Sequence, residues 1–375
     1  MARFIIKIEA SNIESDEKSF WDKLVPIVKD IVELKASGNE LIVVTSDGHF
    51  VGKKQDNFQG DFEVEDHRYG IWRDRRLLRE KICSVIGQPL LISRYVEIFG
   101  RYNHLVAQIL LTRADLADQS RYESIRVMTI NLLKHGIIPV FSENDVLLAG
   151  RFGFGDSDQL ACMLAMAFQA DKLVILSNID GLFAKAPVVG SPQLVREVDD
   201  LDSILGTLCD EKDEVEKERI RSRIEAARMV TSFGIEMHIM NGTKERILIN
   251  SFIEGIANGT VFRSHGVKLK QRKGWVALAA QSKGVIVVST FLAEAINTRK
   301  PVSILLIGVE KVTGNFNKND VVTVKDTDGK VLGRGEVRYS SDELIKLVQK
   351  RINGEKMEFF GSEVIHCDYF VIATP

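Results

Sequence analysis

In the first two thirds of the chain, short apolar runs alternate with longer stretches in which apolar residues recur at helical spacing. The runs Arg3–Ile8 and Glu40–Thr45 are rich in β-branched side chains and predict strands. Between them, the helical spacing over Glu17–Ser37 predicts a helix that stops at Gly38. The same alternation predicts strands at Leu105–Leu111, Ile137–Phe141, Lys172–Leu176 and Glu236–Ile239, and helices at Tyr122–Lys134, Gln159–Gln169 and Arg223–Ser232. Such a pattern is typical of a mostly parallel α/β sheet covered on both faces.

The pattern changes after Phe262, where a polar and basic segment begins. Short strand-like runs follow it, and Asp326–Gly329 has the composition of a hairpin turn between two of them. The predicted elements are strands at Gly284–Ser289, Val302–Ile307, Val321–Val324 and Val331–Arg334, and a helix at Ser341–Gln349. We therefore expect an α/β domain at residues 1–262, a basic linker at 263–274 and a small β-rich domain at 275–375.

Composition narrows the class of protein without identifying it. A length of 375 residues suits two or three domains, and 45% apolar with 27% charged residues indicates a globular chain. The net charge of −2 argues against attraction of the whole protein to nucleic acid or to a membrane surface. The four cysteines include no C-x-x-C pair, so we expect a reducing cytoplasm rather than a zinc site or a disulfide framework.

Neither an export signal nor a membrane span is expected. The apolar run Phe4–Ile6 is broken at once by Lys7. Apolar stretches such as Leu160–Phe168 are far shorter than the roughly eighteen residues that a membrane span needs. The sequence therefore predicts a cytoplasmic protein without a membrane partner.

Polar clusters follow several of the predicted strands, at the sheet edge where parallel sheets bind their ligands. Ser142–Asp145 comes directly after Ile137–Phe141 and is placed to bind a substrate amine or hydroxyl, although an ordinary Asx turn would have the same composition. Gly155–Asp158 precedes a predicted helix, and its two carboxylates around a hydroxyl suit a metal-bound phosphate. The alternative is helix capping alone, and spacing does not decide between the two.

Lys7 is an unexpected charge inside an apolar strand. It is either an edge-strand lysine that points to water, which is the commoner case, or an ammonium that stabilises a transferring phosphoryl group. Two further strand ends, Thr45–Gly48 and Ser177-Asn178, are equally consistent with plain turns. The glycine loops G-x-x-x-x-G-K-[ST] and G-x-G-x-x-G do not occur in the sequence, so neither standard phosphate loop is predicted.

Taken in order, these segments resemble the glutamate 5-kinases, enzymes of the amino acid kinase fold that carry a C-terminal PUA domain. The most specific segments are Leu110–Asp115 and, in the tail, Val312–Phe316 and Arg338–Asp342. The other segments that carry the resemblance are Ile86–Gln88, Ile138–Asp145, Gly155–Asp158, Ala170–Leu176 and Gly181–Phe183. The resemblance spans nearly the whole chain. It implies a three-layer sandwich around a mainly parallel sheet, followed by a PUA-like β-rich domain.

The resemblance implies phosphorylation of the side-chain carboxylate of L-glutamate with ATP and Mg²⁺, the first step of proline biosynthesis. Lys7 matches the lysine that stabilises the transferring phosphoryl group, Asp158 matches the aspartate that organises the catalytic lysines, and Arg223 replaces a second catalytic lysine. The matching substrate positions are Ser46, Asp145 and Ser157, and the nucleotide positions are Lys7, Ser177, Asn178 and Arg223. The resemblance also implies proline as a feedback ligand, a homo-oligomer and glutamyl phosphate reductase as a partner.

Departures from the family pattern leave a second hypothesis open. Glu9 stands where the family has a glycine that lets the backbone approach phosphate, and Asp47 replaces the glycine of a Thr-Ser-Gly turn. Glu214–Ser222 replaces a glycine-rich loop and predicts a continuous, charge-rich helix before Arg223. The alternative is therefore a catalytically impaired protein that senses an amino acid or regulates a true kinase. RNA binding by the tail is a third and weaker hypothesis, because the tail also carries several carboxylates.

Overall fold

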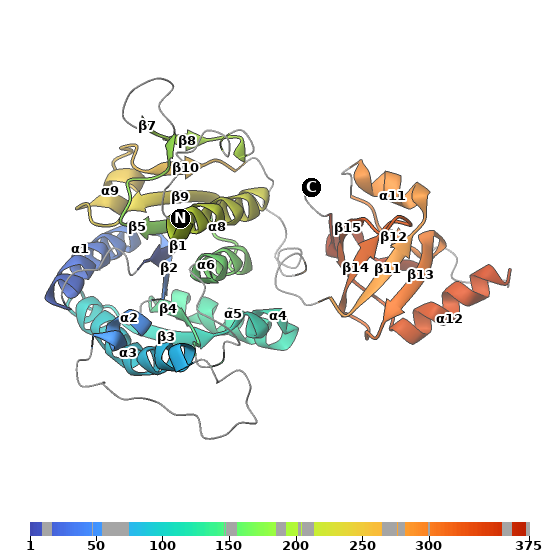
Figure 1. The fold of residues 1–375 in the computed structure, drawn as a ribbon, viewed down its shortest axis with the longest axis horizontal. Helices are drawn as coiled ribbons and strands as arrows, with labels where there is room; N and C mark the ends of the chain where they lie inside the picture. Colours follow the sequence, from blue (N-terminus) through green and yellow to red (C-terminus); the bar gives the residue numbers. More distant parts are fainter. Residues whose placement is uncertain are drawn as a thin grey trace. The chain divides into compact units, whose positions relative to one another are not determined.

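The computed structural model describes residues 1–9, 17–46, 48–54, 75–145, 147, 156–184, 193–201, 204, 214–264, 276, 282–298, 301–354 and 362–372 (Figure 1). By its internal contacts the chain divides into two compact units. The first unit is formed by Met1–Thr112 and Glu123–Lys268, and the second by Arg113–Tyr122 and Leu269–Pro375. Of the predicted linker at 263–274, only the first two residues are among those described, so its boundaries stay a prediction.

An eight-stranded sheet forms the centre of the first unit, in the order β3-β4-β2-β1-β5-β9-β10-β8. Its strands are β1 (Arg3–Ile8), β2 (Glu40–Thr45), β3 (Val106–Leu111), β4 (Ile138–Glu143), β5 (Lys172–Ser177), β8 (Glu197–Val198), β9 (Glu236–Asn241) and β10 (Thr260–Phe262). Neighbouring strands are parallel except for β10, which is antiparallel to β9. The predicted, mostly parallel α/β sheet is confirmed, and β1 lies in its interior with β2 and β5 on either side.

Helices cover both faces of this sheet. They are α1 (Glu17–Ala36), α2 (Gly48–Lys53), α3 (Arg75–Gly100), α5 (Gln119–Lys134), α6 (Asp156–Ala167), α8 (Glu214–Ser232) and α9 (Ile247–Phe252), whereas α4 (Arg113–Ala117) is assigned to the second unit. Phe4, Ile6 and Ile8 of β1 are buried in one apolar core with residues of α1, α3 and α9. Because side chains alternate along a strand, Lys7 points to the opposite face, where Asp158 of α6 accepts a hydrogen bond from its ammonium group.

Helices α2 and α3 touch through glycine. A Cβ added at Gly52 would lie 1.8 Å from the carbonyl oxygen of Cys83, and one at Gly87 would lie 1.7 Å from that of Gly48. Neither distance is possible for a real side chain, so only glycine allows the two backbones to approach so closely. Since α2 starts two residues after Ser46, the contact fixes the first half of α3 beside the carboxyl end of β2.

The second unit has its own sheet, in the order β13-β11-β14-β15-β17, and is drawn in orange and red in Figure 1. Its elements are β11 (Gly284–Val288), α11 (Thr290–Asn297), β12 (Ile304–Leu305), β13 (Val309–Gly314), β14 (Val321–Lys325), β15 (Val331–Glu336), α12 (Ser341–Ile352), β16 (Glu363–Ile365) and β17 (Phe370–Ile372). Leu292 and Ile296 of α11 and Leu344 and Val348 of α12 share one core with the strands. Ser340 begins α12 with a capping box completed by Glu343.

The predicted elements agree with the structure except at one strand. The hairpin turn at Asp326–Gly329 is confirmed, with Gly329 at a φ of 88° between antiparallel β14 and β15. The predicted helix over Glu214–Ser222 is confirmed as the first half of α8. Of the predicted strand Val302–Ile307, only Ile304–Leu305 is confirmed. The carbonyl groups of Leu306 and Ile307 accept hydrogen bonds from Arg351 instead of a neighbouring strand.

One helix departs from the expectation about membrane spans. The segment Leu78–Gly100 of α3 is long and apolar enough to cross a membrane by length and composition alone. A core helix of a soluble protein passes the same test, and Leu91, Tyr95 and Phe99 of this segment are buried against β1 and β2 in the core. The sequence did not single out this segment, because the apolar residues of α3 are interspersed with polar ones and form no continuous run.

Candidate active site

The carboxyl ends of the central strands bring the candidate residues onto one edge of the sheet. Ile8 pairs with Thr45 on one side and with Leu176 on the other, so the next positions along the chains are Glu9, Ser46 and Ser177. Ser177 pairs in turn with Asn241 of β9. Residues from four neighbouring strands therefore meet on one edge, which is where open α/β sheets bind ligands.

Lys7 is a buried lysine in the interior of the sheet, with 3% of its surface exposed. Its Nζ lies 3.2 Å from Glu9 Oε1 and also donates to Asp158 Oδ1. Burial lowers the pKa of Lys7, but the carboxylates of Asp158 and Glu9 more than offset this and hold it above its usual value. The interpretation of Lys7 as an edge-strand lysine that points to water is therefore wrong.

Arg223 comes from the middle of α8 and is almost fully buried, with 2% of its surface exposed. Its Nη2 donates to Glu9 Oε1 at 3.1 Å, to Glu9 Oε2 at 2.8 Å and to the hydroxyl of Ser177 at 3.1 Å. Burial raises the pKa of Glu9, but the positive charges of Lys7 and Arg223 outweigh it and bring the pKa to about 2. Glu9 is thus a permanent anion between two buried cations.

Asp158 lies in the first turn of α6 and is buried. Its carboxylate accepts a hydrogen bond from Lys7, which ties the start of α6 to the central strand. This contact across 151 positions favours the functional interpretation of Gly155–Asp158 over helix capping alone. Ser157 belongs to the same turn, but its side chain and the residues before Asp156 lie outside the described part of the chain.

The end of β5 carries Ser177 and Asn178, two of the four residues predicted to bind nucleotide. Ser177 is fully buried, and its hydroxyl lies 3.5 Å from the side-chain oxygen of Asn178, which is exposed. Next to them, Asp180 accepts a hydrogen bond from Asn241 at 2.8 Å and forms an ion pair with Lys244 at 2.7 Å. These side chains are polar and partly open to solvent, as a nucleotide subsite requires.

Ser46 and Asp145 follow β2 and β4, but they differ in burial. Ser46 is exposed, whereas Asp145 is half-buried and follows the buried Ser142 and Glu143. Burial raises the pKa of Asp145 to about 6, against the opposing effects of Ser84 and Lys81. The alternative of an Asx turn with solvated charges is therefore not supported at this strand end.

Lys81 is a site residue that the sequence did not reveal. It lies on α3, is 5% exposed and interacts electrostatically with Asp145, which raises its pKa while burial lowers it below the usual value. Ser84 and Gln88 follow it at helical spacing and are also buried or half-buried. This polar stripe on an otherwise apolar helix face was the available signal, because three polar residues at positions i, i+3 and i+7 share one face.

Five of the predicted residues thus fall into two groups, and Ser46, Ser157 and Asn178 are not assigned to either. Lys7, Asp158, Arg223 and Ser177 are joined into one network of hydrogen bonds and ion pairs, and Glu9 connects them. Asp145 belongs to a second group with Lys81 and Ser84. In the sequence, Glu9 is only a carboxylate that would repel phosphate, and its contact with Arg223 cannot be read from the chain because 214 positions separate them.

The first group fits the charged parts of a magnesium nucleotide. Lys7 and Arg223 provide an ammonium and a guanidinium, which bind phosphate oxygens. Glu9 and Asp158 provide carboxylate oxygens, the donor type that Mg²⁺ takes in proteins. Both kinds of group are present on the same sheet edge, although each cation already has a carboxylate as partner.

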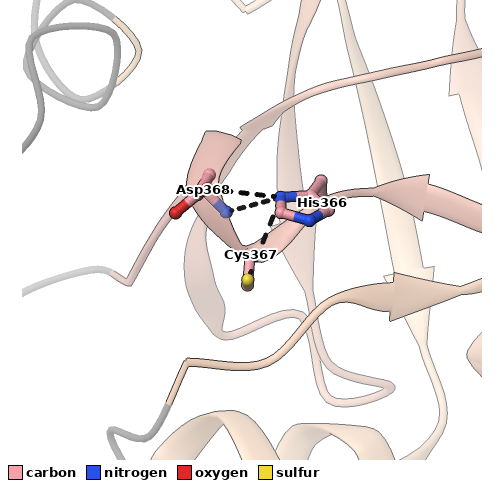
Figure 2. A group of neighbouring side chains, drawn as sticks. All are labelled: His366, Cys367 and Asp368. Carbon is pink, nitrogen blue, oxygen red and sulfur yellow. Dashed lines mark hydrogen bonds and ion pairs between the residues drawn. The ribbon is translucent and has the colours of Figure 1, made fainter.

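A different cluster lies in the second unit and is shown in Figure 2. His366, Cys367 and Asp368 bring ligand atoms within 4.8 Å of one another at the start of a short 3-10 helix. However, Nδ1 of His366 accepts a hydrogen bond from the backbone N–H of Asp368 at 3.0 Å, which caps this helix. We assign Nδ1 of His366 a capping role, because the lone pair that accepts this hydrogen bond cannot also bind a metal.

Comparison with known proteins agrees with this geometry. Residues 2–241 match the amino acid kinase family, and residues 284–353 match the PUA domain. A glutamate 5-kinase from Caldanaerobacter subterraneus subsp. tengcongensis is 32% identical over 99% of this chain and 97% of its own length. Glutamate 5-kinase 2 from Bacillus subtilis is 33% identical over 94% of this chain and 92% of its own length. The relatives therefore match both units together and not the α/β unit alone.

Proposed function

Because the chain belongs to the amino acid kinase family and, over its whole length, to the glutamate 5-kinases within it, we propose that it phosphorylates the side-chain carboxylate of L-glutamate with ATP. The product is glutamyl 5-phosphate, an acyl phosphate, and the reaction is the first step of proline biosynthesis. The observation that carries the proposal is the buried Lys7–Asp158 pair at the carboxyl end of an interior strand of the sheet.

The chemistry needs charge stabilisation more than proton transfer. A carboxylate oxygen of glutamate attacks the γ-phosphorus, the bond to the bridging oxygen breaks, and ADP leaves with the electron pair. The acceptor is already deprotonated at neutral pH, so no general base is required. Negative charge accumulates on the transferring group, and Lys7 and Arg223 are the buried cations that stabilise it.

Positioning of the two cations falls to neighbouring residues. Asp158 holds the ammonium of Lys7 from α6, and Ser177 holds Arg223 from the end of β5. Mg²⁺ would be held by the carboxylate of Asp158 and would supply neutralising charge at the phosphates. Ser177 and Asn178 would bind the nucleotide.

Asp145, which follows β4, would bind the acceptor substrate. Its carboxylate suits the ammonium of L-glutamate, and Lys81 beside it suits the α-carboxylate. Ser46 and Ser157 would add hydroxyl groups to the same subsite. We also propose a cytoplasmic location, a homo-oligomer, feedback by proline, and glutamyl phosphate reductase as a partner.

The test is a direct assay of the full chain. Purified protein with ATP, Mg²⁺ and L-glutamate should release ADP and form an acyl phosphate that hydroxylamine traps as the hydroxamate. Lys7→Met should greatly slow the formation of both products, whereas Lys172→Met should not, because Lys172 lies at the amino end of β5 and pairs with Glu236. Glutamate binding without either product would instead favour the non-catalytic sensor.

A further inference from the structure

Glu9 occupies the place between the two cations of the active site. Its Oε1 lies 3.2 Å from Lys7 Nζ and 3.1 Å from Arg223 Nη2, and its Oε2 lies 2.8 Å from the same Nη2. The hydroxyl of Ser177 adds a third partner to the carboxylate. An ammonium, a guanidinium and a hydroxyl around one anion are the partners that a phosphoryl group takes.

The charges of this network are already balanced without any ligand. Lys7 and Arg223 are positive, and Glu9 and Asp158 are negative. Both cations are almost fully buried, so solvent and salt screen these charges poorly. Adding a phosphoryl dianion to a balanced and buried network is unfavourable unless one of the carboxylates leaves.

Of the two carboxylates, Glu9 is the one that can leave. Its side chain is 13% exposed, whereas those of Lys7 and Arg223 are 4% and 2% exposed. Its backbone N–H is fixed by the carbonyl oxygen of Leu176 at 3.1 Å, so a change of rotamer can move the carboxylate while β1 stays in place. Asp158 is more deeply buried and is anchored in α6.

We propose that Glu9 is a resident anion in the phosphoryl subsite, and that the γ-phosphate of the donor must displace it from Lys7 and Arg223. The identity of the donor as a nucleoside triphosphate rests on the proposed function. Glu9 then determines how tightly the triphosphate binds, since part of the binding free energy is used to break its ion pairs. Because the pKa of Glu9 is about 2, displacement at neutral pH comes from a competing anion and not from protonation.

Binding constants of variants test this competition. The dissociation constants of ATP and of inorganic triphosphate are measured by calorimetry for the wild type, Glu9→Gln and Glu9→Gly. We expect both ligands to bind about tenfold tighter, or more, when the charge is removed. The matched control is Glu40→Gln, because Glu40 pairs with Arg3 at the amino end of the same sheet and should leave both constants unchanged.

Equal or weaker triphosphate binding by folded Glu9 variants would overturn the inference. If the variants do not fold, a crystal structure of the wild type with a non-hydrolysable ATP analogue decides the question. We expect the Glu9–Arg223 pair to be broken in that complex, and an intact pair beside the bound analogue would contradict the proposal. Tighter binding by Glu9→Gln without acyl phosphate from any variant would uphold the inference and refute only the proposed function.

Discussion

Arg223 Nη2 donates to both carboxylate oxygens of Glu9, at 3.1 and 2.8 Å, although 214 positions separate the two residues in the chain. Both residues depart from the family pattern, in which a glycine and a lysine stand at these places. In the fold these two departures compensate each other in charge, because the carboxylate of Glu9 after β1 pairs with the guanidinium of Arg223 on α8.

Substitutions of Glu9 and Arg223 should therefore have non-additive effects on the free energy of unfolding. Arg223→Met leaves a buried carboxylate short of one partner and should lower the free energy of unfolding by about 3–5 kcal/mol. The double variant Glu9→Gln/Arg223→Met should lose less than the sum of the single variants, by about 0.5–3 kcal/mol. Urea denaturation of the four proteins measures this coupling, and strictly additive losses would mean that the contact contributes nothing.

Replacing Lys7 should lower the catalytic rate. Lys7→Met should lower kcat by about 100- to 1,000-fold, because the variant removes a positive charge that acts in the transition state. Steady-state ADP release gives this number. An unchanged kcat would exclude Lys7 from the chemistry, and the Lys172→Met control should keep its rate.

The packing of α2 on α3 should be sensitive to a single methyl group. Gly52→Ala would place a Cβ 1.8 Å from the carbonyl oxygen of Cys83, so the helices must separate. We expect a loss of about 1–3 kcal/mol in stability and a higher KM for glutamate. A Cβ at Gly100, the last residue of α3, meets nothing within 4 Å, so Gly100→Ala is the control. Equal thermal stability of the two variants would contradict this account.

Affinity for glutamate should depend on the ionisation of Asp145. Since burial raises its pKa to about 6, KM for glutamate should fall as the pH rises from 5.5 to about 7.5 and then level off. Lys81→Met should move the midpoint to higher pH, because the ammonium of Lys81 opposes the raised pKa. Asp145→Asn should remove the pH dependence, and a profile that survives this change would assign it to another group.

Asp145 should also make the free energy of unfolding depend on pH. The pKa of Asp145 in the fold lies above the value of about 3.9 for an unfolded chain, so the folded state binds the proton more tightly. The free energy of unfolding should therefore decrease as the pH rises from about 4 through 6. Asp145→Asn should be more stable than the wild type at pH 8, and the difference should vanish near pH 4.

Local pattern was sufficient for most elements of the fold. The predicted bounds of Arg3–Ile8 and Glu40–Thr45 agree with β1 and β2, because both runs are almost wholly apolar and buried on two faces. Helix α3 was not predicted, since Arg75–Glu80 begins it with charges and Pro89 interrupts its pattern. Its packing depends on glycine contacts with α2 that no single segment reveals.

The candidate site was predictable only in part. The types of residue at the strand ends indicated where ligands bind, but not which strand lies in the interior of the sheet. For that reason Lys7 looked like an edge lysine until its neighbours β2 and β5 were known. The meaning of Glu9 and Lys81 lies in contacts with Arg223 and Asp145, far along the chain, which depend on the tertiary fold.

The most direct test of the account is the glutamate-dependent formation of acyl phosphate by the wild-type chain. With ATP and Mg²⁺ we expect hydroxamate to accumulate in step with ADP when L-glutamate is present, and to disappear in Asp158→Asn or after chelation of Mg²⁺. Wild-type protein that is folded and binds ATP, yet forms no hydroxamate with L-glutamate, would contradict the central claim.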